Sequence, residues 1–173
     1  YMHRLTLRDV GVGRTMPFET YLTNAVPPGQ ITAAGHFGPW QRDEPALTPL
    51  DGRFTFDNAD LSVFKGISGI LSASGQFDGS LERITVDGVT HTPDFMVNLS
   101  GHPVPLDTRY HAVVDGTNGN TTLNPVDARF MDTHLVASGG VYEQDGVKGR
   151  VVRLGVSIDT GRLDDFLRVA VPT

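Results

Sequence analysis

Residues 69–81, GILSASGQFDGSL, alternate between apolar or small residues and polar ones along their whole length. Leu71 and Phe77 fall on one side of this pattern, and Ser74 and Asp78 fall on the other. Successive side chains of a β-strand point to opposite faces, so the segment predicts a strand with one apolar face and one hydrated face. This division is typical of antiparallel sheets that face water on one side.

The same alternation continues in both directions from this segment. Between the alternating runs stand Asp-Gly pairs at 51, 78, 87, 115 and 145 and an Asn-Gly pair at 118, which favour tight hairpin turns. The sequence therefore predicts an all-β fold of about nine to eleven strands, a curled antiparallel meander sheet that is either an open groove or sandwich-like. The further alternating runs are 16–24, 30–37, 52–61, 83–91, 94–102, 110–116, 125–142 and 149–158.

Helical signals are confined to two places. Asn58 or Asp60 is a candidate N-cap for one short turn. Near the C-terminus, helical spacing of apolar residues predicts one short amphipathic helix that packs on the sheet, capped by Asp159 or Thr160 and stopped by Pro172. Its apolar residues are Leu163, Phe166, Leu167 and Ala170.

Composition excludes several classes of function. The net charge of −6 and the scattered basic residues give no basic stripe for nucleic acid. The absence of cysteine excludes disulfides, cysteine-zinc sites and thiol catalysis. No apolar run reaches 18 residues and the first residues show no signal peptide. Residues 1–173 are therefore expected to form a single domain, excised from a longer chain.

No established catalytic or metal-binding motif is present, so we expect no enzyme, no cofactor, no metal and no catalytic residue. GVG at 11–13 lacks the third glycine of a dinucleotide fingerprint. His91 and His111 lie on different expected strands, where a meeting of the two rings is an open possibility. The oxygen-rich run at 115–120 resembles the start of a calcium loop but lacks the final acidic ligand, and a polar hairpin explains it better.

The run GHFGPWQRDEPALTPLDG, residues 35–52, holds the only tryptophan, Trp40, and three prolines. Pro39 removes a ladder donor and is expected to end the strand that carries Phe37. We interpret the run as a rigid connection in which Phe37 and Trp40 plug an end of the sheet. Contact of Trp40 with lipid is an alternative, as is a sugar-stacking platform in a carbohydrate-active enzyme with two facing carboxylates.

Taken together, residues 16–95 and the later runs GHPVPL, YHAVVDGTNGNTTLNPVDA, VASGGVY and DDFLRVAV resemble the AsmA-like family of bacterial envelope proteins. FGPW, TPDF and VDGTNG are the more specific elements of this resemblance. It covers the chain from about His3 to Val171.

The resemblance implies a periplasmic protein related to repeating β-groove proteins that move phospholipid or serve outer-membrane assembly. It also implies a membrane-anchored parent, whose inner-membrane helix this chain lacks. The partner would be a phospholipid or other acyl lipid, in a groove lined by Leu71, Phe77, Leu81, Ile84, Val86, Phe95, Val97 and Leu99.

The same residues allow two alternatives to an open groove. The same apolar residues could form the core of a closed sandwich. The chain could instead be a structural, protein-binding module that pairs through edge strands with itself or with other envelope proteins, without lipid.

Overall fold

The described residues form one antiparallel sheet. The structure is a computed structural model that describes residues 1–98, 101–143, 150–162 and 164–165. The sheet order is β1-β2-β3-β4-β6-β7-β8-β9-β10-β11, and β5 pairs only with the far end of β7. The strands are β1 (Met2–Leu7), β2 (Met16–Ala25), β3 (Pro28–Phe37), β4 (Pro49–Asp60), β5 (Ile67–Ser68), β6 (Ile70–Ser80), β7 (Arg83–Val97), β8 (Val104–Val114), β9 (Thr121–Phe130), β10 (Thr133–Glu143) and β11 (Arg150–Thr160).

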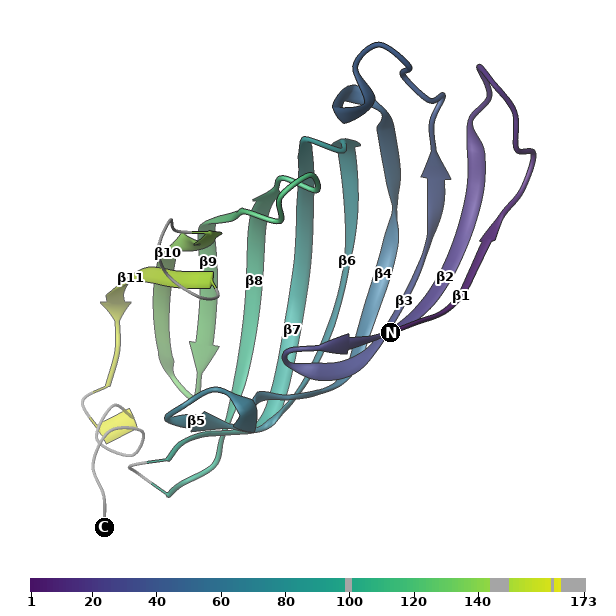
Figure 1. The fold of residues 1–173 in the computed structure, drawn as a ribbon. Coiled ribbons are helices and arrows are strands. Elements are labelled where there is room, and N and C mark those ends of the chain that lie inside the picture. Colours follow the sequence, from purple (N-terminus) through teal and green to yellow (C-terminus); the bar gives the residue numbers. More distant parts are fainter. Residues whose placement is uncertain (99–100, 144–149, 163, 166–173) are drawn as a thin grey trace.

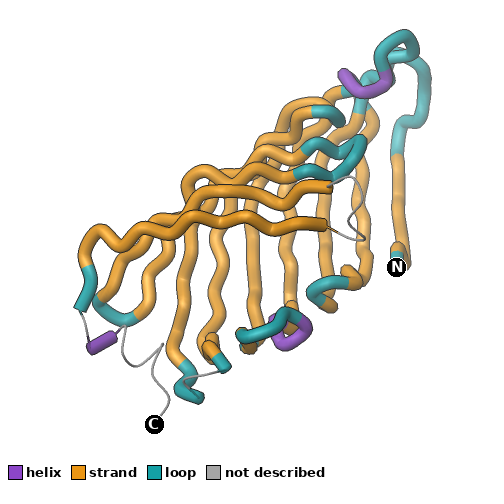
Figure 2. The backbone as a smooth tube through the Cα atoms, turned by 60° about the vertical axis from the view of Figure 1, so that its left-hand side comes forward, coloured by secondary structure: helices purple, strands orange, loops and turns teal. Residues whose placement is uncertain are grey.

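The sheet curls instead of closing. Strands β1 to β4 and β6 to β8 stand side by side as a long bent wall (Figure 1). The sheet then turns, so that its last strands run across the direction of the earlier ones (Figure 2). β1 and β11 remain the two ends of the sheet and do not pair with each other. The expected all-β antiparallel meander is confirmed, and the structure favours the open form over the sandwich.

Two neighbouring register rows show how the sequence divides the two faces. Directly paired residues in a sheet point to the same face, so all side chains of one row lie on one face of the sheet. One row is almost wholly apolar or small: Leu5, Thr20, Ala33, Phe54, Gly75, Gly88, Tyr110, Val126, Ala137 and Val156. The adjacent row is mostly polar: Arg4, Tyr21, Thr32, Thr55, Ser74, Val89, Arg109, Asp127, Val136 and Ser157.

We call the side of the first row the inner face and the other side the outer face. The closed core is small for a chain of this length. The chain exposes 10794 Å², whereas a compact monomer of 18.7 kDa exposes about 8,300 Å². Buried apolar side chains gather in three places: at the curl, around η2, and at Met16. They are Ala112, Ala128, Phe130 and Ala137 at the curl, and Ala59, Leu61 and Val104 near η2 (Leu61–Val63).

The helical predictions had different outcomes. The Asp60 carboxylate accepts a hydrogen bond from the Ser62 N–H and caps the 3-10 turn η2, as one of the two expected caps. Hydrogen bonding from the Ser62 side chain, followed by that backbone hydrogen bond, lowers the pKa of Asp60. The expected C-terminal helix falls mainly on residues 163 and 166–173, which lie outside the described residues. Asp159 and Thr160, its expected caps, instead end β11, so that cap prediction was wrong.

A buried carboxylate fixes the chain beyond β11 against the β9–β10 turn. Asp165 is buried, and its Oδ2 accepts hydrogen bonds from the Asp132 N–H at 3.1 Å and the Thr133 hydroxyl at 3.0 Å. The Thr133 hydroxyl in turn accepts from the Arg162 N–H at 3.2 Å. Because Thr133 is also buried, these groups depend on one another for their hydrogen bonds.

Asp165→Ala is expected to lower the free energy of unfolding by about 1–3 kcal/mol, because it leaves a buried hydroxyl and a backbone N–H without their acceptor. Urea denaturation of the purified chain measures this loss. Asp164→Ala is the matched control, since the Asp164 side chain is 83% exposed and its removal should have little effect. Equal stabilities for the two variants would contradict the role given to Asp165.

Candidate functional site: the inner face

The inner face is a continuous apolar surface that spans the whole sheet. It begins at Leu5 and Leu7 on β1 and reaches Leu154, Val156 and Ile158 on β11, with a buried section at the curl around Ala128 and Ala137. In the described part of the chain no second sheet or helix layer covers it. A sheet normally buries such a face against another layer, so this surface is the main candidate for binding an apolar ligand.

Aromatic rings on the inner face lie over glycines of neighbouring strands, so that the rings project little from the sheet. Gly35 and Gly52 are paired between Phe18 on β2 and Phe77 on β6, whose ring centroids are 6.4 Å apart. A Cβ on Gly52 would lie 2.6 Å from the Phe77 ring. The glycines therefore provide the space into which the flanking rings lean.

The same arrangement occurs nearer the centre of the sheet. The Tyr110 ring lies over its partner Gly88, where an added Cβ would be 2.6 Å from the ring. Burial at this position raises the pKa of the Tyr110 hydroxyl above its ordinary value. The space beside Gly88 is therefore occupied by a neighbouring ring and is not open to a lipid tail.

Most residues predicted to line a groove lie on the inner face. Phe77, Ile84 and Val86 share paired rows with other inner-face residues, and Leu71 alternates in phase with Phe77. Phe95 and Val97 follow a bulge at the far end of β7, where Phe95 pairs with Val104. Leu81 differs, because it lies in the β6–β7 turn, where its carbonyl accepts from the Gly116 N–H. Leu99 lies outside the described residues.

The connection between β3 and β4 is tied firmly to the sheet. The Gly38 N–H donates to the Pro49 carbonyl, and the hydroxyl of fully buried Thr48 accepts from the Gln41 N–H. The 3-10 turn η1 (Pro45–Leu47) lies within it. Phe37 ends β3, and its ring centroid lies 6.1 Å from that of Trp40. The two residues expected to plug an end of the sheet are thus in contact, with Trp40 partly exposed.

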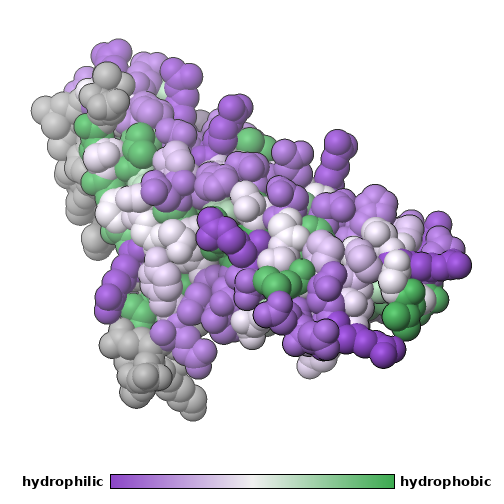
Figure 3. Space-filling model, turned by 90° about the horizontal axis from the view of Figure 1, so that it is seen from above, coloured by the Kyte–Doolittle hydropathy of each residue, from purple (hydrophilic) through white to green (hydrophobic). Residues whose placement is uncertain are grey.

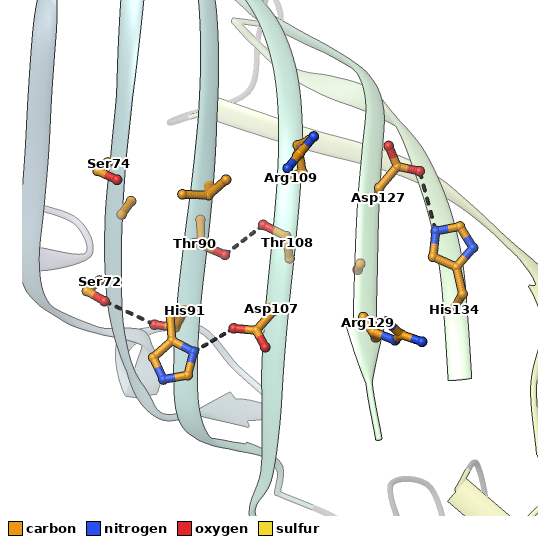
Figure 4. Close-up of a pocket in the computed structure, with 13 residues that line it drawn as sticks. Ser72, Ser74, Thr90, His91, Asp107, Thr108, Arg109, Asp127, Arg129 and His134 are labelled. Carbon is orange, nitrogen blue, oxygen red and sulfur yellow. Dashed lines mark hydrogen bonds and ion pairs between the residues drawn. The ribbon is translucent and has the colours of Figure 1, made fainter. Parts of the chain in front are cut away.

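The outer face carries a second candidate site, a basin of about 540 Å³ that lies over strands β6 to β10. Its acidic and basic side chains come from four neighbouring strands, and Asp107 and Asp127 each pair with basic residues of the adjoining strands (Figure 4). The His91 ring nitrogen Nδ1 bonds to Asp107, and His134 lies 3.5 Å from Asp127. Sequence reasoning missed these pairs, because they depend on strand register.

The outer-face histidines are engaged as cross-strand pairs. His111 bonds to Asp87 at 2.9 Å and His36 to Asp51 at 3.0 Å, in addition to the two pairs of the basin. His91 and His111 therefore do not meet; each faces an aspartate on the neighbouring strand. The Ser72 hydroxyl donates to the His91 carbonyl, not to its ring, so the basin lacks the serine–histidine bond that activates a nucleophile.

The oxygen-rich loop at 115–120 uses its oxygens internally. The Asp115 carboxylate accepts from the N–H and hydroxyl of Thr117 and from the Asn118 side-chain amide. These hydrogen bonds lower the pKa of Asp115. Within the part of the chain that is described, no three histidine, aspartate or glutamate side chains are grouped as metal ligands. The loop has the polar hairpin form that the sequence favoured.

Comparisons with protein-family models, with curated proteins and with solved structures found no match for this chain. No helix among the residues described is long and apolar enough to cross a bilayer.

Proposed function

We propose that this chain is a non-enzymatic segment of an AsmA-like bacterial envelope protein, and that its inner face holds phospholipid acyl chains during lipid transfer or outer-membrane maintenance. The proposal places the segment in the periplasm, with an inner-membrane anchor in a longer parent. The observation that carries it is the apolar row from Leu5 to Val156, which is buried at Ala137 but has no second layer over it among the described residues. The sequence resemblance supports the choice of lipid.

The shape of the inner face suits an acyl chain better than a compact apolar ligand. Burial of one methylene contributes about 0.8 kcal/mol, so a tail lying across several strands gains several kcal/mol. Because aromatic rings lie over Gly52 and Gly88, these rings project little from the sheet, and an acyl tail can extend along it. Because the sheet is open, the polar headgroup can stay in water while its tails contact the sheet.

A photo-crosslinking pair tests this function. Val86 and Val89 are both on β7, but Val86 pairs with Ala112 on the inner face and Val89 pairs with Arg109 on the outer face. We expect a benzophenone amino acid at Val86 to crosslink radiolabelled phosphatidylethanolamine in a bacterial host, and the same group at Val89 to give little product. Equal labelling, or labelling at Val89 alone, would contradict lipid binding on the inner face.

The two free edges of the sheet favour one alternative function. Among the described residues β1 and β11 each have a sheet partner on one side only, and exposed strand edges promote pairing with further strands. A structural module of this kind would form concentration-dependent oligomers and carry no lipid. Light scattering of the chain, combined with lipid extraction from the same sample, separates this function from lipid binding.

A further inference from the structure

Two loops at one end of the sheet expose an apolar tip. The β1–β2 connection, residues 8–15, and the β3–β4 connection, residues 38–48, border a cleft of about 400 Å³. Its lining includes Val10, Val12 and Trp40, whose exposed fractions are 72%, 78% and 44%. Seen from above, green apolar patches lie among hydrophilic side chains at this end of the molecule (Figure 3). Large apolar side chains grouped on exposed loops are typical of an interaction site.

Hydrogen bonds order each of the two loops, and their backbones approach closely at Gly38. Gly38 has a positive φ of 94°, and a Cβ there would lie 3.0 Å from the Arg14 carbonyl oxygen. The Arg14 N–H donates to the Gly11 carbonyl, which closes the turn that carries Val12. The hydroxyl of buried Thr48 accepts from Gln41, next to Trp40. The tip is thus presented by an ordered backbone, which limits the ordering cost of binding.

The tip is continuous with the inner face. Met16 lines the cleft and pairs with Phe37 in the β2–β3 ladder. The Phe37 ring in turn contacts Trp40. An apolar path therefore leads from the inner face, through Met16 and Phe37, to the exposed side chains of the loops.

The charges around the tip indicate which surface it suits. The two loops carry three arginines and three carboxylates, so that they have no net charge: Arg8, Arg14, Arg42, Asp9, Asp43 and Glu44. Arg8 is already paired with Glu19. A tryptophan beside aliphatic side chains and arginine suits the boundary between headgroups and acyl chains. Balanced charges match the paired charges of zwitterionic headgroups and argue against attraction by anionic lipid alone.

We propose that this end of the sheet docks on a zwitterionic phospholipid bilayer, with Val10, Val12 and Trp40 at headgroup level. The inference rests on the proposed function, because docking here places the end of the inner face against the membrane that supplies or receives the lipid. It adds a membrane contact made by two loops, whereas the proposed function concerns the sheet surface.

Trp40 is the only tryptophan, so intrinsic fluorescence reports on the tip alone. Phosphatidylcholine–phosphatidylethanolamine vesicles are expected to shift the Trp40 emission to shorter wavelength and to carry the chain upward in a flotation gradient. Vesicles with brominated acyl chains should quench this emission. Binding should change less than twofold between 50 and 500 mM salt, because insertion of apolar side chains is not screened.

Val10→Asp together with Val12→Asp is expected to reduce vesicle binding at least tenfold. The matched control is Val26→Asp together with Val63→Asp, because both valines are exposed at the opposite end of the sheet. The control should bind vesicles like the unchanged chain. Equal losses in the two double variants, an unchanged Trp40 spectrum at saturating vesicles, or binding that requires anionic lipid would each overturn the proposal.

The two proposals fail separately. If the tip docks but the inner face binds no lipid, vesicles float the chain while the Val86 crosslink is missing. If the inner face binds lipid but the tip does not dock, Val10→Asp with Val12→Asp leaves both the Val86 crosslink and flotation unchanged. Flotation carried by a protein contaminant would not be quenched by brominated lipid, and this result would also overturn the docking proposal.

Discussion

Gly35→Ala is expected to lower the free energy of unfolding by about 3 kcal/mol, near the upper end for overpacking by a small group. An added Cβ would lie 1.9 Å from the Asp51 carbonyl oxygen and 2.5 Å from the Gly52 Cα. Both contacts are with the backbone of β4, so no side chain can rotate to relieve them. The β3–β4 ladder must therefore separate locally, in a protein whose closed core is small. Urea denaturation followed by circular dichroism measures the loss.

Gly155→Ala is the control for this effect. Gly155 lies within β11, and the nearest atom to an added Cβ is the Ser138 carbonyl oxygen at 3.8 Å, an ordinary contact distance. Its substitution should change stability by less than about 0.5 kcal/mol. If Gly35→Ala were as stable as Gly155→Ala, close backbone approach at Gly35 would not limit this sheet.

The second large effect concerns lipid binding. Val156→Glu should reduce the phospholipid recovered with the purified chain at least tenfold, because a carboxylate under an acyl chain loses its hydration without gaining a partner. Val156 is on the inner face and 62% exposed, so the fold should tolerate the charge. Val89→Glu is the matched control on the outer face, where Val89 is 44% exposed. Lipid extraction with native mass spectrometry measures both.

Comparison of the two valines makes the result interpretable. Both substitutions add the same charge at an exposed strand position, so a change common to both reports on net charge or stability. A loss confined to Val156→Glu identifies the inner face as the lipid surface. Unchanged lipid in both variants, or loss in both, would remove the main support for the proposed function.

Alternation along each strand was sufficient to predict the class of fold. The run around Phe77 separates apolar from polar side chains. The expected turns at the Asp-Gly pairs 51, 78 and 87 were wrong, because these pairs lie within β4, β6 and β7, and only the pairs at 115 and 118 fall in a described turn. The same reasoning placed Asp60 as a cap, because capping depends on residues close in sequence. It gave the wrong cap at Asp159, where β11 continues to Thr160, since helical spacing over a few residues does not show where a neighbouring strand ends.

The site depends more heavily on pairing between distant segments. No property of Gly88 alone indicates that Tyr110, 22 positions later, covers it, and the ladder of β7 and β8 supplies that contact. The His91–Asp107 pair has the same origin. The buried carboxylate of Asp165 was also missed, because its partners lie on the β9–β10 turn, far from it in sequence.

The amino-acid sequence is enough to show that the strands have one apolar and one polar side, since period-two alternation is a local property of extended chain. Strand pairing brings these apolar sides into one face from Leu5 to Val156, which is open over much of the sheet and buried at the curl around Ala137. That outcome depends on register across every ladder and on the curl of the whole sheet. The energies of both are set by contacts between residues far apart in the chain, such as the approach of Gly35 to Gly52.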